Sequence, residues 1–502
     1  MNINSTSPLL PRANDDDADA TSTTRAVAGG QPAGNTATPG QQTTRERKMI
    51  LTYLEFYSGV GGWGYALEAA CRSLSASFVY DEAAASKRPR VAVSPPEPDE
   101  GGVTTQASAR LLAAFDHSDL CNGVFQHNHK DIGKRCKPRQ TPIERLSLDE
   151  LEQYDATVWC LSPPCQPHTR QHSNQHRERD DPRSSSFLHL CDLLIEMDED
   201  MLPNLLLLEN VVGFEQNWAV ADDCGRDDMG SFTLWRKVLC DRQYETAHFH
   251  LDPTDVGIPN NRPRHYTVAF RRGRSLRRRL SGGRSNEIHS FTRIEGLEKL
   301  FARETLDKPP IIHDERSLSR LCSTSEPTRI EAFLDPALSP ASLEQLRIPK
   351  KIRESSGAWC FDIVTPEQRR SSCFTHSYGK FIRGTGSILY TGPVAANDCE
   401  GDALPRAELF ELADPKDRAY DESWSKRINW EEDMRYLSGT EIARLFGFPV
   451  DCASDGPTAM RSFEFPSTCT MKQQWKLLGN SINVIVASTV AYVGVTLLCN
   501  ED

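Results

Sequence analysis

The sequence predicts an α/β fold built on a doubly wound, mostly parallel sheet. Short apolar segments alternate with segments of helical periodicity between residues 51 and 270. Polar residues begin where each apolar segment ends, and a glycine-rich turn joins the first apolar segment to the first helical one. Because parallel strands are buried on both faces, they read as continuous apolar runs, and their carboxyl ends collect ligands. A functional site is therefore expected at that edge of the sheet.

The first strand and helix are predicted from the stretch that begins at Leu51. Leu51–Tyr57 (LTYLEFY) is short, apolar and aromatic, as a buried strand should be. The turn Ser58–Gly62 (SGVGG) follows, and a helix is expected after it because large and small apolar residues recur on one face, namely Trp63, Ala66, Leu67, Ala70 and Leu74.

Further strands and helices are predicted in alternation. Ala109–Phe115 is a second strand that ends at Asp116, and apolar residues at helical spacing follow it. Ser147 and Glu150 have the spacing of a capping box, which predicts that a short helix begins there. Ala156–Leu161 and Leu205–Leu208 are two more strands.

Composition divides the chain into four consecutive parts, one of which contains an insertion. Residues 1–47 are poor in large apolar groups and are predicted to form a disordered tail. Residues 48–270 form the first domain, and 83–106 are a disordered insertion within it. Residues 271–433 are irregular, rich in proline and charged, which predicts a second, smaller domain. The chain then returns to the first domain for residues 434–502.

Charge and cysteine content exclude several classes of protein. The net charge of −12 argues against broad electrostatic capture of nucleic acid, although a local basic surface remains compatible with it. The fifteen cysteines form no C-x-x-C pair, so we expect reduced thiols and no metal site. The apolar segment Ile482–Cys499 contains polar residues and no basic flank, which favours a buried helix over a membrane span.

The glycine turn and the strand-end residues are candidates for a functional site. Glycines allow close approach of a ligand, and Asp116 suits ribose hydroxyls; a purely structural turn is the alternative. A nicotinamide oxidoreductase is disfavoured because the third glycine of the dinucleotide motif is missing. Cys165, after two prolines at a strand end, could be an inert core residue or a nucleophile.

Glu209 also lies at a strand end, after the apolar stretch NLLLL. Such a carboxyl group would have a raised pKa and could donate a proton; an N-cap or a solvated glutamate is the alternative. Arg262 and Arg264 precede a predicted strand and fit phosphate or base recognition, with surface solvation as the alternative.

Five motifs in order resemble the cytosine-5 methyltransferase family. FYSGVGG (56–62) is similar to its cofactor loop, SPPCQP (162–167) to its nucleophile motif, and ENV (209–211) to its acid motif. RPR (262–264) and LLGNSINV (477–484) are similar to its late motifs. The resemblance implies a Rossmann-like fold that uses S-adenosyl-L-methionine, with residues 48–270 and 434–502 as the catalytic domain and 271–433 as a target-recognition domain.

The segment SSCFTHSYGKFIRGTGSIL (371–389) resembles the small transfer-RNA branch of that family. This branch methylates an anticodon-loop cytosine of aspartate tRNA, so tRNA is the implied partner and Cys373, Phe374 and Thr375 the implied substrate contacts. A DNA cytosine-5 methyltransferase and a silent nucleic-acid-binding relative are the alternatives. His168 departs from the branch, which has Phe there.

The resemblance also implies the roles of individual residues. Cys165 would add to carbon 6 of cytosine, Glu209 would protonate ring N3, and Arg262 and Arg264 would steady the base. The residues implied to line the cofactor are Phe56, Tyr57, Ser58, Gly59, Gly61, Gly62, Asp116, Ile143, Glu144, Ser162, Asn480 and Ser481. We expect a monomer in the cytoplasm or nucleus, with no membrane partner, whose basic run 271–284 contacts tRNA phosphates.

Overall fold

The structure is a computed structural model. It describes residues 46–75, 104–130, 133, 137–164, 184–217, 230–271, 297–314, 317, 326–355, 357–392, 429–451 and 461–499. These residues lie in one compact unit, Thr44–Asp502.

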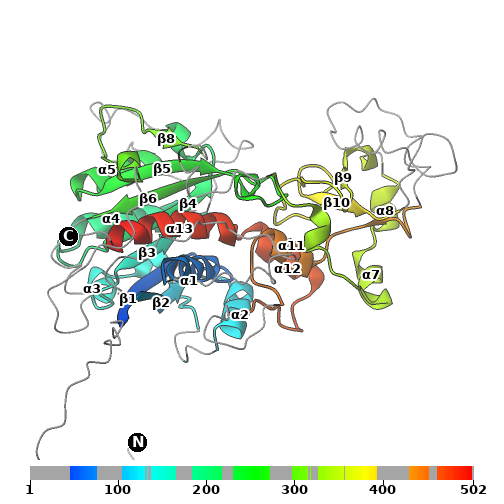
Figure 1. The fold of residues 1–502 in the computed structure, drawn as a ribbon, viewed down its shortest axis with the longest axis horizontal. Coiled ribbons are helices and arrows are strands. Elements are labelled where there is room, and N and C mark those ends of the chain that lie inside the picture. The colour runs from blue at the N-terminus through cyan, green and yellow to red at the C-terminus, as the bar shows by residue number, and fades with distance from the viewer. Residues whose placement is uncertain are drawn as a thin grey trace, which may run out of the picture. The chain divides into compact units, whose positions relative to one another are not determined.

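An eight-stranded sheet forms the centre of this unit (Figure 1). Its strands are β1 (Glu46–Phe56), β2 (Thr104–Phe115), β3 (Val158–Leu161), β4 (Leu205–Val211), β5 (Glu245–Leu251), β6 (Arg264–Phe270), β7 (Ala302–Arg303) and β8 (Ile312–His313). The order is β2-β1-β3-β4-β6-β5-β7, and β8 pairs with β5. The first four strands are parallel, whereas β6 runs antiparallel to both β4 and β5.

The central strands are apolar because helices cover both faces of the sheet. Alternate side chains of a strand point to opposite faces. Leu205 and Leu207 of β4 therefore belong to one hydrophobic core, and Leu206 and Leu208 belong to the other. This explains why four consecutive leucines occur in a strand rather than an apolar–polar alternation.

Two helices from opposite ends of the described chain cover one face. α1 (Gly62–Ser75) packs against α13 (Val484–Cys499), and α13 also packs on β4 and β6 (Figure 1). Gly494 allows this approach, because a Cβ atom there would lie 2.7 Å from Cδ1 of Leu205. On the other face, α4 (Ser185–Glu196) packs against α5 (Ser231–Asp241).

The other helices are short. The α-helices are α2 (Asp119–Asn128), α3 (Leu148–Glu152), α7 (Pro340–Leu346), α8 (Lys350–Arg353), α11 (Gly439–Leu445) and α12 (Met471–Gly479). The 3-10 helices are η3 (Ile143–Arg145), η5 (Phe214–Asn217), η7 (Pro253–Val256), η8 (Leu297–Leu300), η10 (Ile330–Phe333) and η11 (Ala358–Cys360).

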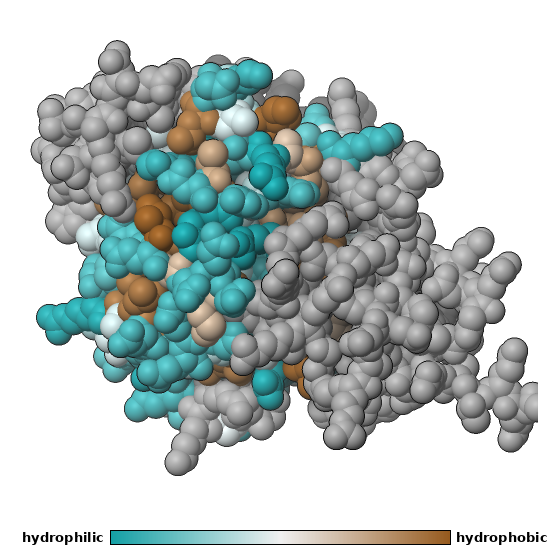
Figure 2. Space-filling model, turned by 90° about the vertical axis from the view of Figure 1, so that its left-hand side faces the viewer, coloured by the Kyte–Doolittle hydropathy of each residue, from teal (hydrophilic) through white to brown (hydrophobic). Residues whose placement is uncertain are grey.

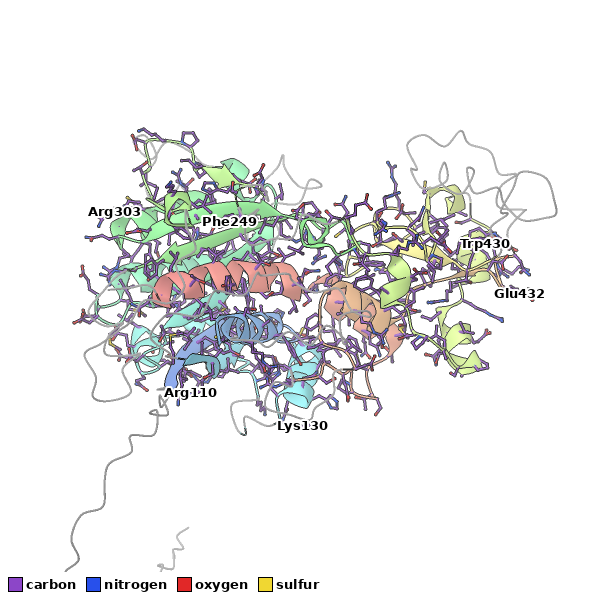
Figure 3. All side chains as sticks on the ribbon, in the orientation of Figure 1. Arg110, Lys130, Phe249, Arg303, Trp430 and Glu432 are labelled. Atoms are coloured by element: carbon purple, nitrogen blue, oxygen red, sulfur yellow. The ribbon has the colours of Figure 1, made fainter. Side chains whose placement is uncertain are left out.

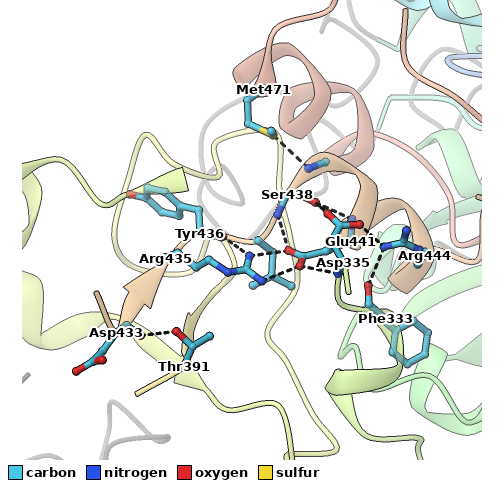
Figure 4. A network of polar contacts seen from close by, with 12 residues as sticks. Phe333, Asp335, Thr391, Asp433, Arg435, Tyr436, Ser438, Glu441, Arg444 and Met471 are labelled. Carbon is cyan, nitrogen blue, oxygen red and sulfur yellow. Dashed lines mark hydrogen bonds and ion pairs between the residues drawn. The ribbon is translucent and has the colours of Figure 1, made fainter. Parts of the chain in front are cut away.

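A second sheet has three strands: β9 (Asp362–Val364), β10 (Ser387–Tyr390) and β11 (Met434–Arg435). A buried polar network connects β11 to α11 (Figure 4). Arg435 donates two hydrogen bonds to the Glu441 carboxylate, at 2.8 and 2.7 Å. Glu441 and Ser438 also form the capping box that begins α11. Because these buried charges are paired and hydrogen-bonded, the network fixes the position of α11 relative to the small sheet.

The predicted α/β class is confirmed, and the strand boundaries differ in detail. β1 begins two residues inside the predicted tail, and β2 begins three residues inside the predicted insertion. The two added stretches pair with each other, Glu46 with Thr104, so backbone hydrogen bonding supports them without apolar side chains. The rest of the tail and of the insertion lies outside the described residues.

The large sheet continues past residue 271, because β7 and β8 pair with β5. Conversely, β11 begins at residue 434 but pairs with β10 of the small sheet. The domain boundaries stay a prediction.

The helix predicted from the Ser147 capping box is present, and the Ser147 side chain accepts a hydrogen bond from the amide of Glu150. The Glu150 carboxylate pairs with Arg139.

One helical stretch, Met471–Leu498, is long and apolar enough to cross a membrane. The share of its most apolar window that is buried inside the protein is 89%. On the face drawn in Figure 2, the coloured residues are mostly hydrophilic, and the hydrophobic ones occur in small groups.

Candidate active site

The candidate site lies at the carboxyl edge of the parallel strands. β1, β2, β3 and β4 end at Phe56, Phe115, Leu161 and Val211, and parallel strands end on the same side. The antiparallel strand β6 begins at that side, because its first residue, Arg264, pairs with Val211. Residues before β6 therefore meet residues after β1 to β4.

The glycine turn after β1 is held against the end of β2. The Ser58 amide donates to the Phe115 carbonyl at 3.0 Å, and the Gly59 amide donates to Oδ2 of Asp116 at 2.9 Å. Gly61 has a φ of 92°, and a Cβ atom there would lie 2.7 Å from the His129 ring. Only glycine satisfies both requirements at this position.

Glu55, in β1, and Trp63, in α1, flank this turn and were not among the predicted site residues. Oε1 of Glu55 accepts a hydrogen bond from the amide of Trp63 at 3.1 Å, and the Trp63 indole donates to Oγ of Ser162 at 2.9 Å. Burial, reinforced by the nearby Asp116 carboxylate, raises the pKa of Glu55 to about 8 despite hydrogen bonds from backbone amides. An acidic residue inside the apolar run LTYLEFY was the available signal.

The other predicted cofactor residues surround the same turn. A Cβ atom on Gly62 would lie 2.6 Å from Ile482 and 3.7 Å from Oγ of Ser481, so the late motif packs on the turn. Glu144 is exposed and accepts a hydrogen bond from Ser185 at 3.0 Å. Tyr57 has a φ of 57° and lies within electrostatic range of Glu144.

Two predicted cofactor residues, Phe56 and Ile143, offer less to a ligand because their side chains are buried. The ring of Phe56 is buried in the core and stacks on Phe115, with centroids 5.0 Å apart. Only its backbone could contact a cofactor. Ile143 is also buried, whereas Asn480 caps the carboxyl end of α12 and is exposed.

Glu209 is a buried acid paired with one arginine. Its carboxylate lies 3.2 Å from Nε of Arg264, and only 8% of the residue is exposed. Burial raises the pKa of Glu209 above its usual value, and the guanidinium groups of Arg264 and Arg262 offset this only in part. The carboxyl group therefore holds its proton to higher pH than a solvated glutamate does.

Arg262 joins three segments that are far apart in the sequence. Its guanidinium donates to the Phe374 carbonyl at 3.0 Å and to the carbonyls of Gly479 and Ser481 at 3.1 and 2.7 Å. It also lies 3.4 Å from Sγ of Cys373. The arginine is almost completely buried, and burial lowers its pKa. Its hydrogen bonds to backbone carbonyls make it a positioning residue for the segments it joins.

The predicted substrate segment lies directly on the late motif. A Cβ atom on Gly479 would lie 2.1 Å from backbone atoms of Thr375 and His376. Phe374 is buried, while Cys373 is partly exposed. The segment 373–375 is thus held at the edge of the sheet by Arg262 and by α12.

The predicted nucleophile Cys165 lies outside the described residues, as do His168 and residues 272–284 of the basic run. The chain is described as far as Pro164, three residues beyond the end of β3. The nucleophile assignment therefore stays a prediction.

Comparison with known proteins decides the family. The family model for C-5 cytosine-specific DNA methylase matches residues 103–493, which is most of the chain. The chain belongs to this family. It is a cytosine-5 methyltransferase, and S-adenosyl-L-methionine is its cofactor.

Curated relatives carry different substrate names. A "tRNA (cytosine(38)-C(5))-methyltransferase" of Mus musculus is 28% identical, covering 89% of this chain and 93% of the relative. A "DNA (cytosine-5)-methyltransferase" of Dictyostelium discoideum is 27% identical, covering 88% of this chain and 94% of the relative. The solved structure of S. pombe Dnmt2 methyltransferase is 24% identical, with a TM-score of 0.53 over 89% of this chain and 98% of that one. This likeness supports the fold.

The turn after β1 fits the sulfonium cofactor of the family. Oγ of Ser58 is buried and makes no hydrogen bond within the described part of the chain, which leaves it for a ligand. Asp116 accepts hydrogen bonds from two backbone amides and keeps lone pairs for ribose hydroxyls. Ser58, Gly59, Asp116 and Ser481 would hold the cofactor at this edge.

Proposed function

We propose that this methyltransferase acts on tRNA, at an anticodon-loop cytosine of aspartate tRNA, through a covalent adduct with Cys165. Glu209 is the observation that carries the proposed chemistry: a buried carboxyl group with a raised pKa lies at the edge where the motifs meet. The proposed reaction needs a neutral acid next to the base, and this side chain can supply it.

The chemistry follows from the weak nucleophilicity of carbon 5 of cytosine. The Cys165 thiolate forms a bond to carbon 6 while Glu209 gives its proton to ring N3, which makes carbon 5 an enamine carbon. S-adenosyl-L-methionine supplies the methyl group that carbon 5 then takes. A water molecule takes the proton from carbon 5, Cys165 leaves carbon 6 as the thiolate, and the N3 proton returns to Glu209, which restores the aromatic ring.

The neighbouring arginines have separate tasks in this proposal. Arg264 lies against Glu209 and limits how far burial raises its pKa, so that the proton can be given up. Arg262 holds the segment 373–375 next to the residues that follow α12. The partly exposed Cys373 would then contact the substrate beside the acid.

An RNA loop is a favourable substrate for such a site. The target atom of a stacked base is out of reach, so the base must be extruded, and a loop cytosine costs less to extrude than a paired one. Curated relatives of similar length in Mus musculus and Homo sapiens carry the tRNA name, at 28% and 29% identity. We also propose a monomer that meets tRNA in the cytoplasm or the nucleus.

DNA methylation is the second candidate function. It is favoured by the Dictyostelium discoideum relative, whose printed name is that of a DNA enzyme at 27% identity. The acid, the arginines and the proposed nucleophile would serve both substrates equally. The choice therefore depends on a direct assay.

Incubation with radiolabelled methyl donor and either total tRNA or duplex DNA tests the substrate. Label is expected in tRNA, and bisulfite sequencing should locate it in the anticodon loop of aspartate tRNA. Label found only in DNA would overturn the proposal in favour of the second candidate.

The covalent step is tested with tRNA that contains 5-fluorocytosine at the target position. Fluorine at carbon 5 blocks the final elimination, so the wild-type protein should become attached to the tRNA and migrate as a larger species. Cys165→Ala should give no such species, whereas Cys373→Ala should still give it. A Cys165→Ala variant that methylates tRNA as well as the wild type would exclude the nucleophile.

A further inference from the structure

Three residues with metal-binding side chains meet beside the candidate active site, at the carboxyl edge of the large sheet. Glu215 lies in η5, just after β4, whereas His250 and His265 lie on β5 and β6. One donor atom of each residue lies within 4.8 Å of the other two. His250 and His265 are directly paired across the two strands, and Phe249, labelled in Figure 3, marks this stretch of β5.

The distances between these donors fit a small coordination sphere. Oε1 of Glu215 lies 3.0 Å from Nε2 of His250, and Oε2 lies 3.4 Å from Nδ1 of His265. In a tetrahedral zinc site with bonds of about 2.0–2.1 Å, neighbouring donors are about 3.3–3.4 Å apart. The donor atoms could therefore close on an ion with small side-chain movements.

The two imidazole nitrogens that face Glu215 are not used by hydrogen bonds. Nε2 of His250 and Nδ1 of His265 are both buried, and neither makes a hydrogen bond to another described residue. Nε2 of His250 lies close enough to Oε1 of Glu215 for a hydrogen bond, but the two groups are not aligned for one. Buried nitrogens that converge on one carboxylate without hydrogen bonding to it are a second indication of a ligand between them.

Neighbouring groups orient the donors as they do in metal sites. Nε2 of His265 lies 3.2 Å from the Thr267 hydroxyl, which leaves Nδ1 facing Glu215. The Gly213 amide donates to both oxygens of Glu215 at 3.1 Å. His248 lies nearby, but its nitrogens contact Thr267 and Glu304 at 2.9 and 3.1 Å. It therefore packs beside the cluster and is not one of the donors.

We propose that Glu215, His250 and His265 bind one divalent transition-metal ion of the zinc class. Two imidazoles and one carboxylate are a common three-ligand set for zinc, with a water molecule in the fourth position. The fourth position would open beside His250, whose side chain is 33% exposed, while that of His265 is fully buried. The ion would tie η5, and with it the end of β4 that carries Glu209, to β5 and β6.

Cobalt(II) titration of chelator-treated protein tests the site directly. One equivalent should bind and give the visible absorption of a tetrahedral cobalt centre, without the near-ultraviolet band of thiolate ligation. Zinc added afterwards should abolish the absorption. Failure of the wild-type protein to bind cobalt, or a thiolate band, would overturn the proposal.

Two variants assign the ligands. His250→Gln and Glu215→Gln should each lower cobalt affinity by at least ~10-fold, whereas His127→Gln, a histidine outside the cluster, should bind as the wild type does. Circular dichroism checks that the variants fold. If both ligand variants bind one equivalent with unchanged affinity, the cluster is not the site. If they unfold, the wild-type stoichiometry and spectrum still decide.

Discussion

At the scale of single residues, the active edge contains an acid under two opposing influences. Burial raises the pKa of Glu209, and the positive charge of Arg264, 3.2 Å away, lowers it. The proposed reaction uses the protonated acid, so activity should be lost as pH rises through that pKa.

Arg264→Gln should shift the alkaline limb of kcat/KM for tRNA methylation to higher pH, by on the order of one unit. The limb moves to higher pH because loss of a nearby positive charge disfavours the carboxylate and raises the pKa of Glu209 further. Arg353→Gln, which breaks an ion pair with Glu431 elsewhere, should leave the limb in place. A limb that stays unchanged or moves to lower pH in Arg264→Gln would remove Glu209 as the acid.

Glu55 should make folding stability depend on pH. Because the folded state raises its pKa from 4.5 to about 8, the folded protein binds the proton more tightly and loses stability as pH rises across that window. Glu55→Gln should flatten this decline by up to about 1.4 kcal/mol per pH unit, measured by urea unfolding at each pH. Glu344→Gln, an exposed control, should follow the wild-type curve; if Glu55→Gln does so too, Glu55 is ionised in the folded state.

Strand ends made part of this site predictable from the sequence. Glu209 and Arg264 could be predicted because each adjoins an apolar run. The partners of Arg262 could not be predicted, since they come from positions more than a hundred residues away. His250 and His265 were missed for the same reason: their convergence on Glu215 depends on antiparallel pairing of β5 with β6.

At the scale of elements, the carboxyl end of α12 and the segment 373–376 touch backbone to backbone. Gly479 permits this contact, because any side chain there would overlap atoms that cannot move aside. The contact brings the late motif and the predicted substrate segment together.

Gly479→Ala should destabilise the protein by about 1–3 kcal/mol, or lower tRNA methylation if the segment moves instead, because a Cβ atom would lie 2.1 Å from backbone of Thr375 and His376. Urea unfolding and methylation rates measure the two effects. Gly123→Ala is the matched control: a Cβ atom there meets nothing within 4 Å inside α2, so stability should stay or rise by up to ~1 kcal/mol. Equal behaviour of the two variants would contradict the packing argument.

The sequence predicted the helices α1, α2, α3 and α13, the four parallel strands and β6, but not the remaining helices or the rest of the sheet. Leu205–Leu208 reads as a buried strand because both of its faces are covered. β7 and β8 are two residues long and partly exposed, so they carry no periodic signal. Only pairing with β5 makes them strands.

At the scale of the whole molecule, an acidic protein with a net charge of −12 must bind a polyanion locally. The basic run 271–284 (RRGRSLRRRLSGGR) is the sequence candidate for this contact, and from residue 272 it lies outside the described part of the chain.

Reversal of Arg277, Arg278 and Arg279 to Glu should weaken tRNA binding and reduce the slope of log K against log salt concentration by about 2–3, because up to three phosphate contacts are lost. Filter binding across a salt series measures the slope. Arg303→Glu on β7 is the control for a charge reversal outside the basic run. A slope identical to that of the wild type would show that the basic run does not touch the backbone of the tRNA.

The packing of α13 on α1 has a consequence for synthesis on the ribosome. α1 and the strands beneath it are translated long before α13, the helix that covers them. Their apolar surface therefore stays uncovered until α13 has been made, and contacts between segments so far apart in the sequence form slowly. Nascent chains of this enzyme should consequently depend on chaperones until α13 has left the ribosome.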